Sequence, residues 1–170
     1  MNINKFTQKS MEAVQNCEKL AYEYGNQQIE QEHLLLALVS DQEGFIPQLL
    51  TAMGMTVPSF QAASSALVNK LPKVSGGGRE ADKVYVAQDV DRALTAAQEQ
   101  AQAMKDEYIS VEHLMLAIFS EGTSDVKQLL QSHGITRSRF TDELSKVKTA
   151  PVPSDNPEET YDALKKYGTD

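Results

Sequence analysis

Two glutamate–histidine pairs are the first candidates for chemistry in this sequence. They open two nearly identical segments, EHLLLALVS at residues 32–40 and EHLMLAIFS at residues 112–120. A zinc protease places two histidine ligands one helical turn apart in the pattern HExxH. Here His33 and His113 directly follow their glutamates, and no third ligand recurs at a fixed spacing. We therefore expect no metal at these positions and assign both histidines to a helix turn or an interface.

The single cysteine is the other candidate for chemistry. Cys17 falls on the apolar stripe of a predicted helix, and no histidine and acid can be assembled to activate it, so we expect a small buried hydrophobic side chain. One cysteine excludes an internal disulfide and favours a reducing, cytoplasmic setting. The sequence has no G-x(4)-GK[ST] phosphate loop. We predict no catalytic residue, no metal site and no cofactor in this segment.

The two similar segments belong to an internal repeat. Residues 6–70 align without a gap with residues 86–150, at an offset of 80 positions. Identical pairs extend along the whole alignment and include Ala13/Ala93, Ile29/Ile109, Leu50/Leu130, Gly54/Gly134 and Phe60/Phe140. The sequence thus predicts one domain over residues 1–148, with one repeat over 1–70, a Gly-rich surface connection over 71–85 and a second repeat over 86–148.

Each repeat is predicted to contain four helices. The first carries one apolar stripe at i, i+3, i+4 spacing. The second, the EHL segment, is apolar almost all round, which is typical of a helix packed on several sides. The third should end at Gly54 or Gly134, where a residue without Cβ can adopt the left-handed cap conformation. The fourth should begin at the N-caps Thr56 and Thr136. The predicted fold class is all-α, with two pseudo-symmetric four-helix repeats packed together.

Residues 149–170 differ in character from both repeats. Prolines at 151 and 153 indicate a linker, and residues 156–168 indicate a short amphipathic helix, with Pro157 in the first turn and lysines in the last. We expect this helix to lead to a further domain beyond the end of the sequence.

The charge of the chain favours proteins as partners. With a net charge of −8 and no basic cluster, it lacks the side chains that nucleic-acid backbones and anionic membranes require. The longest apolar run, residues 34–39, is far shorter than the roughly 20 residues that cross a bilayer. The first ten residues lack the apolar core of a signal peptide. We expect neither nucleic acid nor a membrane as partner.

These features resemble the amino-terminal double Clp repeat domain of the Clp chaperones, and its ClpB-type members most. The resemblance is carried by EHLLLAL and EHLMLAI, the LL-x(3)-G ends of the third helices, the start MNINKFTQKS, the joint LPKVSGGG and the exit ALKKYG, and it covers essentially the whole chain. It implies a substrate-binding module of a hexameric disaggregase that threads unfolded or aggregated polypeptides and works with the DnaK chaperone system. ATP and magnesium would bind an ATPase region beyond Asp170, and the isolated domain is expected to be monomeric.

The resemblance also implies a substrate-binding groove between the repeats. Matched position by position, its polar rim falls on Thr7, Asp106 and Glu112, and Leu94 falls on an apolar groove position. Unfolded chains expose apolar side chains and free backbone N–H groups. Carboxylates can accept hydrogen bonds from these N–H groups. Two of these residues also have simple structural explanations, because Thr7 can cap a helix and the charge of Glu112 suits a helix start.

Two other functions stay open on sequence alone. The domain could dock a folded adaptor, as in ClpA- and ClpC-like unfoldases, or it could be a small helical enzyme. Shifts of amide NMR signals on adding a folded adaptor, with none on adding an unfolded polypeptide, would favour adaptor docking. Hydrolysis or a bound metal that is lost in His33→Ala or His113→Ala would favour the second.

Overall fold

The computed structural model describes residues 5–41, 43–74 and 84–148, which form eight helices and one pair of short strands. The first repeat contains α1 (Gln8–Glu23), β1 (Gln28–Ile29), α2 (Gln31–Val39), α3 (Phe45–Ala52) and α4 (Val57–Asn69). The second contains β2 (Tyr85–Val86), α5 (Gln88–Ala103), α6 (Val111–Glu121), α7 (Ser124–Ser132) and α8 (Arg137–Val147). The predicted all-α class with four helices in each repeat is confirmed. The predicted linker helix at 156–168 lies outside the described residues.

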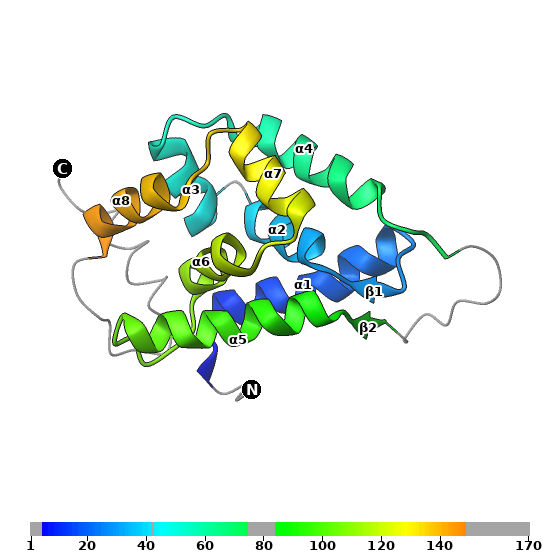
Figure 1. Ribbon diagram of the computed structural model, residues 1–170, viewed down its shortest axis with the longest axis horizontal. Coiled ribbons are helices and arrows are strands. Elements are labelled where there is room, and N and C mark those ends of the chain that lie inside the picture. Colours follow the sequence, from blue (N-terminus) through cyan, green and yellow to red (C-terminus); the bar gives the residue numbers. More distant parts are fainter. Residues whose placement is uncertain (1–4, 42, 75–83, 149–170) are drawn as a thin grey trace.

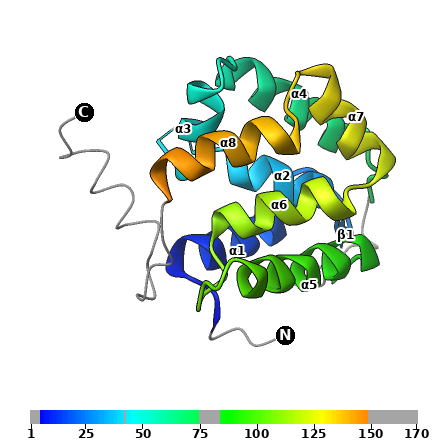
Figure 2. The ribbon, with the colours of Figure 1, turned by 60° about the vertical axis from the view of Figure 1, so that its left-hand side comes forward.

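The helices form three layers (Figures 1 and 2). Helices α1 and α5 lie on one side, α2 and α6 in the middle, and α3, α4, α7 and α8 on the other side. The middle helices are the EHL segments, as expected for helices that are apolar almost all round. Every residue of α2 is buried, and so is α6 from Val111 to Ile118. The main packing joins α5 to α6, α1 to α2 and α2 to α4.

The two repeats exchange backbone hydrogen bonds. Residues Ile29 and Val86 pair in parallel between β1 and β2, and Phe6 pairs in parallel with Ile109. Because Phe6 and Val86 are equivalent in the repeat alignment, as are Ile29 and Ile109, one pairing is the pseudo-two-fold copy of the other. The amide of Thr7 donates to the Ile109 carbonyl at 3.0 Å, and that of Ala87 donates to Ile29 at 2.9 Å. We call these contacts the Phe6–Ile109 seam and the β1–β2 seam.

Helix ends follow the sequence expectations closely. The third helix of each repeat stops before Gly54 (φ 86°) or Gly134 (φ 71°), which take the left-handed conformation that favours glycine. Thr136 caps α8 by accepting the Arg139 amide. Thr56 occupies the N-cap of α4, but its side chain makes no capping hydrogen bond. The predicted positions of both caps are therefore correct, whereas only one hydroxyl performs the capping.

The buried environment of Cys17 confirms its assignment as a small hydrophobic side chain. It is 2% exposed, and burial raises the pKa of its thiol to about 12, so the nucleophilic thiolate is disfavoured. In the part of the chain that the structure describes, no helix has the length and apolar character needed to span a membrane.

The first helix of each repeat ends in the same left-handed turn, although the residue at its centre differs. Gly25 has a φ of 75° and its counterpart Lys105 a φ of 61°. In both turns the amide of the following residue donates a hydrogen bond to a carbonyl five residues earlier in the helix. Asn26 donates to Ala21 at 2.8 Å, and Asp106 donates to Ala101 at 2.9 Å. The turn therefore fixes the direction in which the Asn26 or Asp106 side chain leaves the helix.

Replacing Lys105 by glycine should stabilise the protein by about 0.5 kcal/mol, because glycine avoids the Cβ clash of the left-handed conformation at some entropic cost. The reciprocal change, Gly25→Lys, should cost about 1 kcal/mol. Urea unfolding of both variants measures this difference. A less stable Lys105→Gly variant would contradict the assignment of strain to this turn.

Candidate functional site

Each histidine of the repeated EHL segment caps the helix that it begins. The backbone amide of Glu30 donates a hydrogen bond to Nδ1 of His33 at 2.9 Å. In the same way, the amide of Ser110 donates to Nδ1 of His113 at 2.9 Å. Because Nδ1 accepts in both cases, the ring proton lies on Nε2. These are the N-cap amides of two helices buried on all sides, so the ring replaces the water that an exposed helix end would bind. The prediction of helix-turn histidines is confirmed.

The second ring nitrogen of each histidine faces the turn that ends the preceding helix. Nε2 of His33 lies 2.8 Å from Asn26 Oδ1, and Nε2 of His113 lies 2.7 Å from Asp106 Oδ2. Burial lowers the pKa of His33 to about 4, which keeps its Nδ1 free to accept. Each repeat therefore has the same hydrogen-bonded arrangement, in which the histidine bridges the N-cap amide of the central helix and a polar side chain of the preceding turn.

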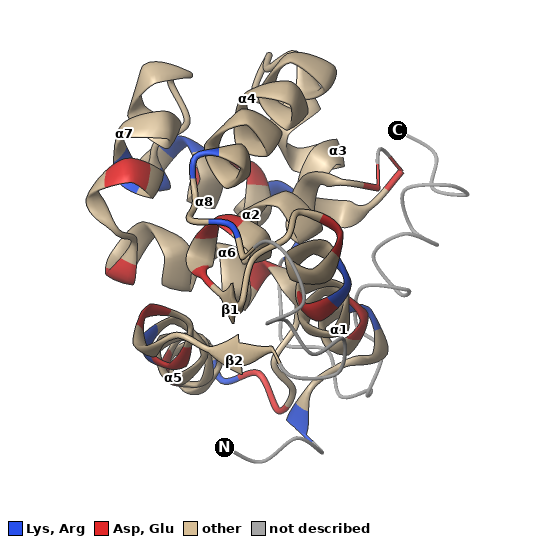
Figure 3. Cartoon of the chain, turned by 90° about the vertical axis from the view of Figure 1, so that its right-hand side faces the viewer, with Lys and Arg blue, Asp and Glu red and all other residues tan. Residues whose placement is uncertain are grey.

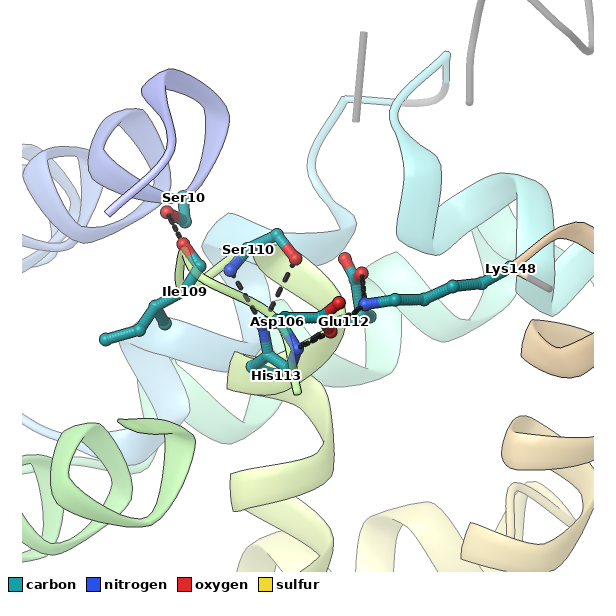
Figure 4. A network of polar contacts seen from close by, with 7 residues as sticks. All are labelled: Ser10, Asp106, Ile109, Ser110, Glu112, His113 and Lys148. Atoms are coloured by element: carbon teal, nitrogen blue, oxygen red, sulfur yellow. Dashed lines mark hydrogen bonds and ion pairs between the residues drawn. The ribbon is translucent and has the colours of Figure 1, made fainter. Parts of the chain in front are cut away.

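The second repeat adds charge to this arrangement. In the first repeat the neutral Asn26 also donates from Nδ2 to the Pro72 carbonyl at 2.9 Å. In the second repeat Asp106 bonds to Lys148, which follows the end of α8 (Figure 4). The counterpart of Lys148 in the repeat alignment is the fully buried Val68. The second repeat therefore has the charged pair Asp106 and Lys148 at the positions where the first repeat has the neutral residues Asn26 and Val68.

Lys148 joins two carboxylates in a nearly closed site. Its Nζ lies 2.7 Å from Glu112 Oε2 and also contacts Asp106 Oδ2. The exposed fractions of the Lys148, Asp106 and Glu112 side chains are 6%, 6% and 0%. Burial alone would raise the pKa of Asp106, but hydrogen bonds and charge from His113 and Lys148 bring it below its ordinary value. Asp106, Glu112 and His113 are close enough to hold a metal, but the lysine already supplies the positive charge.

Thr7 lies at the other side of the same seam. Its hydroxyl caps α1 by accepting the Ser10 amide at 3.2 Å, and its side chain is fully buried. The Ser10 hydroxyl donates to the Ile109 carbonyl at 2.6 Å, so the start of α1 is fastened to the segment before α6. The structural role predicted for Thr7 is confirmed, and a contact between Thr7 and substrate stays a prediction.

Leu94 lies apart from the other three predicted residues. It is half-buried on α5 and packs against the core. Leu94 lies nine residues before Ala103, the last residue of α5, which is about 14 Å along the helix axis. The structure thus brings Thr7, Asp106 and Glu112 to the Phe6–Ile109 seam and places Leu94 farther along α5.

A depression of about 130 Å³ opens beside this seam. Its wall comes from α1, α2, α3 and the α2–α3 connection of the first repeat, together with Val111 of the second. The apolar lining is Ala13, Ala37, Leu38, Phe45, Ile46 and Val111, and the charged lining is Lys9, Glu12, Asp41 and Glu43. None of the four predicted residues lines it, but Thr7 is two residues from Lys9 and Glu112 follows Val111. A hollow with both apolar and charged lining therefore lies mainly in the first repeat, and the second repeat contributes Val111, the neighbour of Glu112 in sequence.

Sequence reasoning missed Lys148. The repeat alignment contains a signal for it, because Asn26/Asp106 and Val68/Lys148 change from neutral to charged in the same copy. Many other positions also gain a charge in the second copy, such as Gly25/Lys105 and Ala66/Lys146, so this signal alone does not pair Asp106 with Lys148.

A double-mutant cycle on Glu112 and Lys148 should show strong coupling. Glu112→Gln or Lys148→Met alone should each cost about 3 kcal/mol, because each leaves a buried charge without one of its partners. The double variant should cost at least about 1 kcal/mol less than the sum of the single changes. Urea unfolding of the four proteins measures the coupling, and additive losses would contradict a shared buried network.

Comparison with known proteins places the chain in a family. Residues 5–133 match the family described as Clp repeat (R) N-terminal domain. The whole chain is 37% identical to the chaperone protein ClpB of Bacillus cereus over 171 residues, which is 20% of that protein. It is 36% identical over 172 residues to ClpB of Nitratidesulfovibrio vulgaris, again 20% of that protein. The chain therefore spans about a fifth of the length of the curated relatives it matches.

Solved structures show the same fold. The N-terminal domain of Hsp104 from Candida albicans superimposes with a TM-score of 0.78 at 19% identity, covering 91% of this chain and 99% of that one. The N-domain of ClpV from Vibrio cholerae gives 0.69 at 14% identity, covering 88% and 89%. The match of residues 5–133 shows that the chain belongs to the Clp repeat N-terminal domain family, and over its whole length it is similar to the N-terminal region of ClpB chaperones.

Proposed function

We propose that this domain binds unfolded or aggregated polypeptides and presents them to a ClpB-type disaggregase. The larger protein would be a hexameric ATPase using ATP and magnesium, would work in the cytoplasm and would cooperate with the DnaK system. The observation that carries the proposal is the hollow of the first repeat, lined by apolar and charged side chains and closed by Val111 of the second repeat, together with the Asp106–Glu112–Lys148 cluster at the Phe6–Ile109 seam. A solved complex of the ClpV N-domain with a VipB peptide, with a TM-score of 0.65 at 14% identity and coverage of 91% of this chain and 90% of that one, supports peptide binding by this fold.

The hollow suits weak binding of many different sequences. Its apolar lining can cover a hydrophobic side chain of an unfolded segment, and full burial of one such side chain contributes roughly 1.5 to 3 kcal/mol. A single contact of this size gives little affinity or sequence preference. Both properties suit a domain that must hold diverse clients and release them for threading.

The carboxylates would bind the polar part of the client. Glu112 is fully buried and Asp106 is nearly so. The Lys148 ammonium forms an ion pair with both carboxylates. A donor from the client, either a backbone N–H or a lysine or arginine head group, would therefore replace the Lys148 ammonium. Thr7 would act by holding the start of α1 against Ile109, which keeps the adjoining wall of the hollow in place. Leu94 lies on α5, which does not line the hollow, so it would give the client a second, separate apolar contact.

Fluorescence anisotropy with labelled casein, an unfolded polypeptide, tests this exchange. Lys148→Met should tighten binding by about tenfold, because a client donor no longer competes with the lysine for a charged hydrogen bond of about 1.5 kcal/mol. Glu112→Gln should weaken binding by a similar factor. The matched control is Lys146→Met, which removes the same charge two residues away at an exposed position.

These measurements are made at a temperature where circular dichroism shows every variant folded. If Lys148→Met and Glu112→Gln both weaken binding, or neither changes it, the cluster is structural and the proposed contact is wrong. Binding of a folded adaptor but not of casein would point to the adaptor-docking function instead.

A further inference from the structure

Three carboxylates from the two repeats converge at the β1–β2 seam. Glu30 is the N-cap of α2, Glu32 lies in the first turn of α2, and Asp89 lies in the first turn of α5. Each offers a carboxylate oxygen, and these oxygens lie within 4.8 Å of one another. Figure 3 shows β1 and β2 side by side, with red acidic positions close to β1. The first repeat provides two of these groups and the second repeat provides one.

The Glu32 carboxylate is enclosed without a full set of partners. Glu32 is 6% exposed, and its Oε1 has no hydrogen-bond partner among the described residues. Asp89 Oδ1 is likewise buried and without a described partner. Burial, followed by the charges of Glu30, Asp89 and Asp125, raises the pKa of Glu32 to about 7, although a backbone hydrogen bond opposes the shift. The pKa values of Glu30 and Asp89 are also raised, with burial as the largest cause.

The other seam shows how the protein handles the same position when it supplies a cation itself. In the repeat alignment, Ser110 replaces Glu30, Glu112 corresponds to Glu32 and Lys9 replaces Asp89. Glu112 is paired with Lys148 through Oε2, while its Oε1, like that of Glu32, has no hydrogen-bond partner among the described residues. At the β1–β2 seam, none of the three carboxylates forms an ion pair with a described residue. Backbone hydrogen bonds from Gln31 and Val90 lower the pKa of Asp89, and the exposed Arg92 is the described cation whose charge also lowers it.

Hydrogen bonds fix the geometry of the cluster. The side chain of Gln31, which lies between Glu30 and Glu32, donates from Nε2 to the carbonyls of Asp89 and Glu121, both at 2.8 Å. Its Oε1 accepts the Thr123 amide at 2.8 Å. Together with the β1–β2 pairing, these bonds hold α2 and α5 in register. The carboxylates are therefore held together by the backbone, despite their mutual repulsion.

We infer that Glu30, Glu32 and Asp89 bind a divalent cation that prefers oxygen ligands, Ca²⁺ or Mg²⁺, at the β1–β2 seam. Carboxylate oxygens are the ligands of these hard cations, and the absence of histidine and cysteine from the trio disfavours zinc. Water would complete the coordination, and the ion would link the first repeat to the second. Helix N-termini offer an alternative compensation for the three charges, which predicts no cation binding.

Isothermal titration calorimetry of the 170-residue chain with CaCl₂ and with MgCl₂ tests the inference. The protein is first treated with chelator, and NaCl keeps the ionic strength constant at a pH near 8, where the carboxylates are ionised. We expect one saturable site with a Kd of about 0.1 to 1 mM for at least one of the ions. Glu32→Gln should weaken that binding at least tenfold. The matched control is Glu99→Gln, the same change at an exposed position of α5, which should leave it unchanged.

Two further measurements keep the result interpretable. Glu32→Gln should melt at a higher temperature than the parent protein without metal, because it removes an uncompensated buried charge, so a folding failure is not expected. Mn²⁺ should broaden the amide signals of residues 29–33 and 88–90 before any others in NMR spectra. Absence of saturable binding by either ion up to 10 mM, or equal affinity in Glu32→Gln, would overturn the inference in favour of compensation by the helix ends.

Discussion

The N-terminal ends of the two central helices lie inside the protein, where water cannot satisfy their backbone amides. A helix leaves its first amides without partners inside the helix, and an unpaired buried N–H is destabilising by about 1 to 3 kcal/mol. In each copy a histidine ring accepts a hydrogen bond from the N-cap amide. The other nitrogen of the ring contacts Asn26 in the first repeat and Asp106 in the second. The glutamate–histidine pair recurs because both copies bury their second helix at its start.

Duplication lets the two copies keep one scaffold while their charges diverge. Both seams use the same parallel pairing, but one combines Glu112 with Lys148 and the other gathers Glu30, Glu32 and Asp89. Each polar cluster lies at the start of a central helix, so each is held by backbone and core packing. Ligand binding at either cluster would thus act on the contact between the repeats.

Local sequence patterns predicted the helices and their ends well. Gly54 and Gly134 stop their helices, Thr7 and Thr136 cap theirs, and Cys17 is buried, because short-range periodicity and backbone sterics decide these features. Four helices per repeat could be predicted for the same reason.

The contacts between distant residues could not be predicted from those patterns. Lys148 reaches Glu112 across 36 residues, and Gln31 reaches Glu121 across 90. The rim residues expected at the surface are instead enclosed, with Thr7 and Glu112 fully buried. Only the packing of the repeats brings these groups together, and helical periodicity carries no information on that packing.

The most direct test of the proposed binding site uses the equivalent turn of the first repeat, residues 26–33, as an internal control. Amide and lysine Nζ signals of the isotope-labelled chain would be followed by NMR during titration with unfolded casein. The account predicts shifts at Lys148, residues 106–113 and the residues lining the hollow, while the equivalent turn at 26–33 stays unchanged. Equal shifts at residues 26–33 and 106–113, or shifts elsewhere with Lys148 undisturbed, would contradict it.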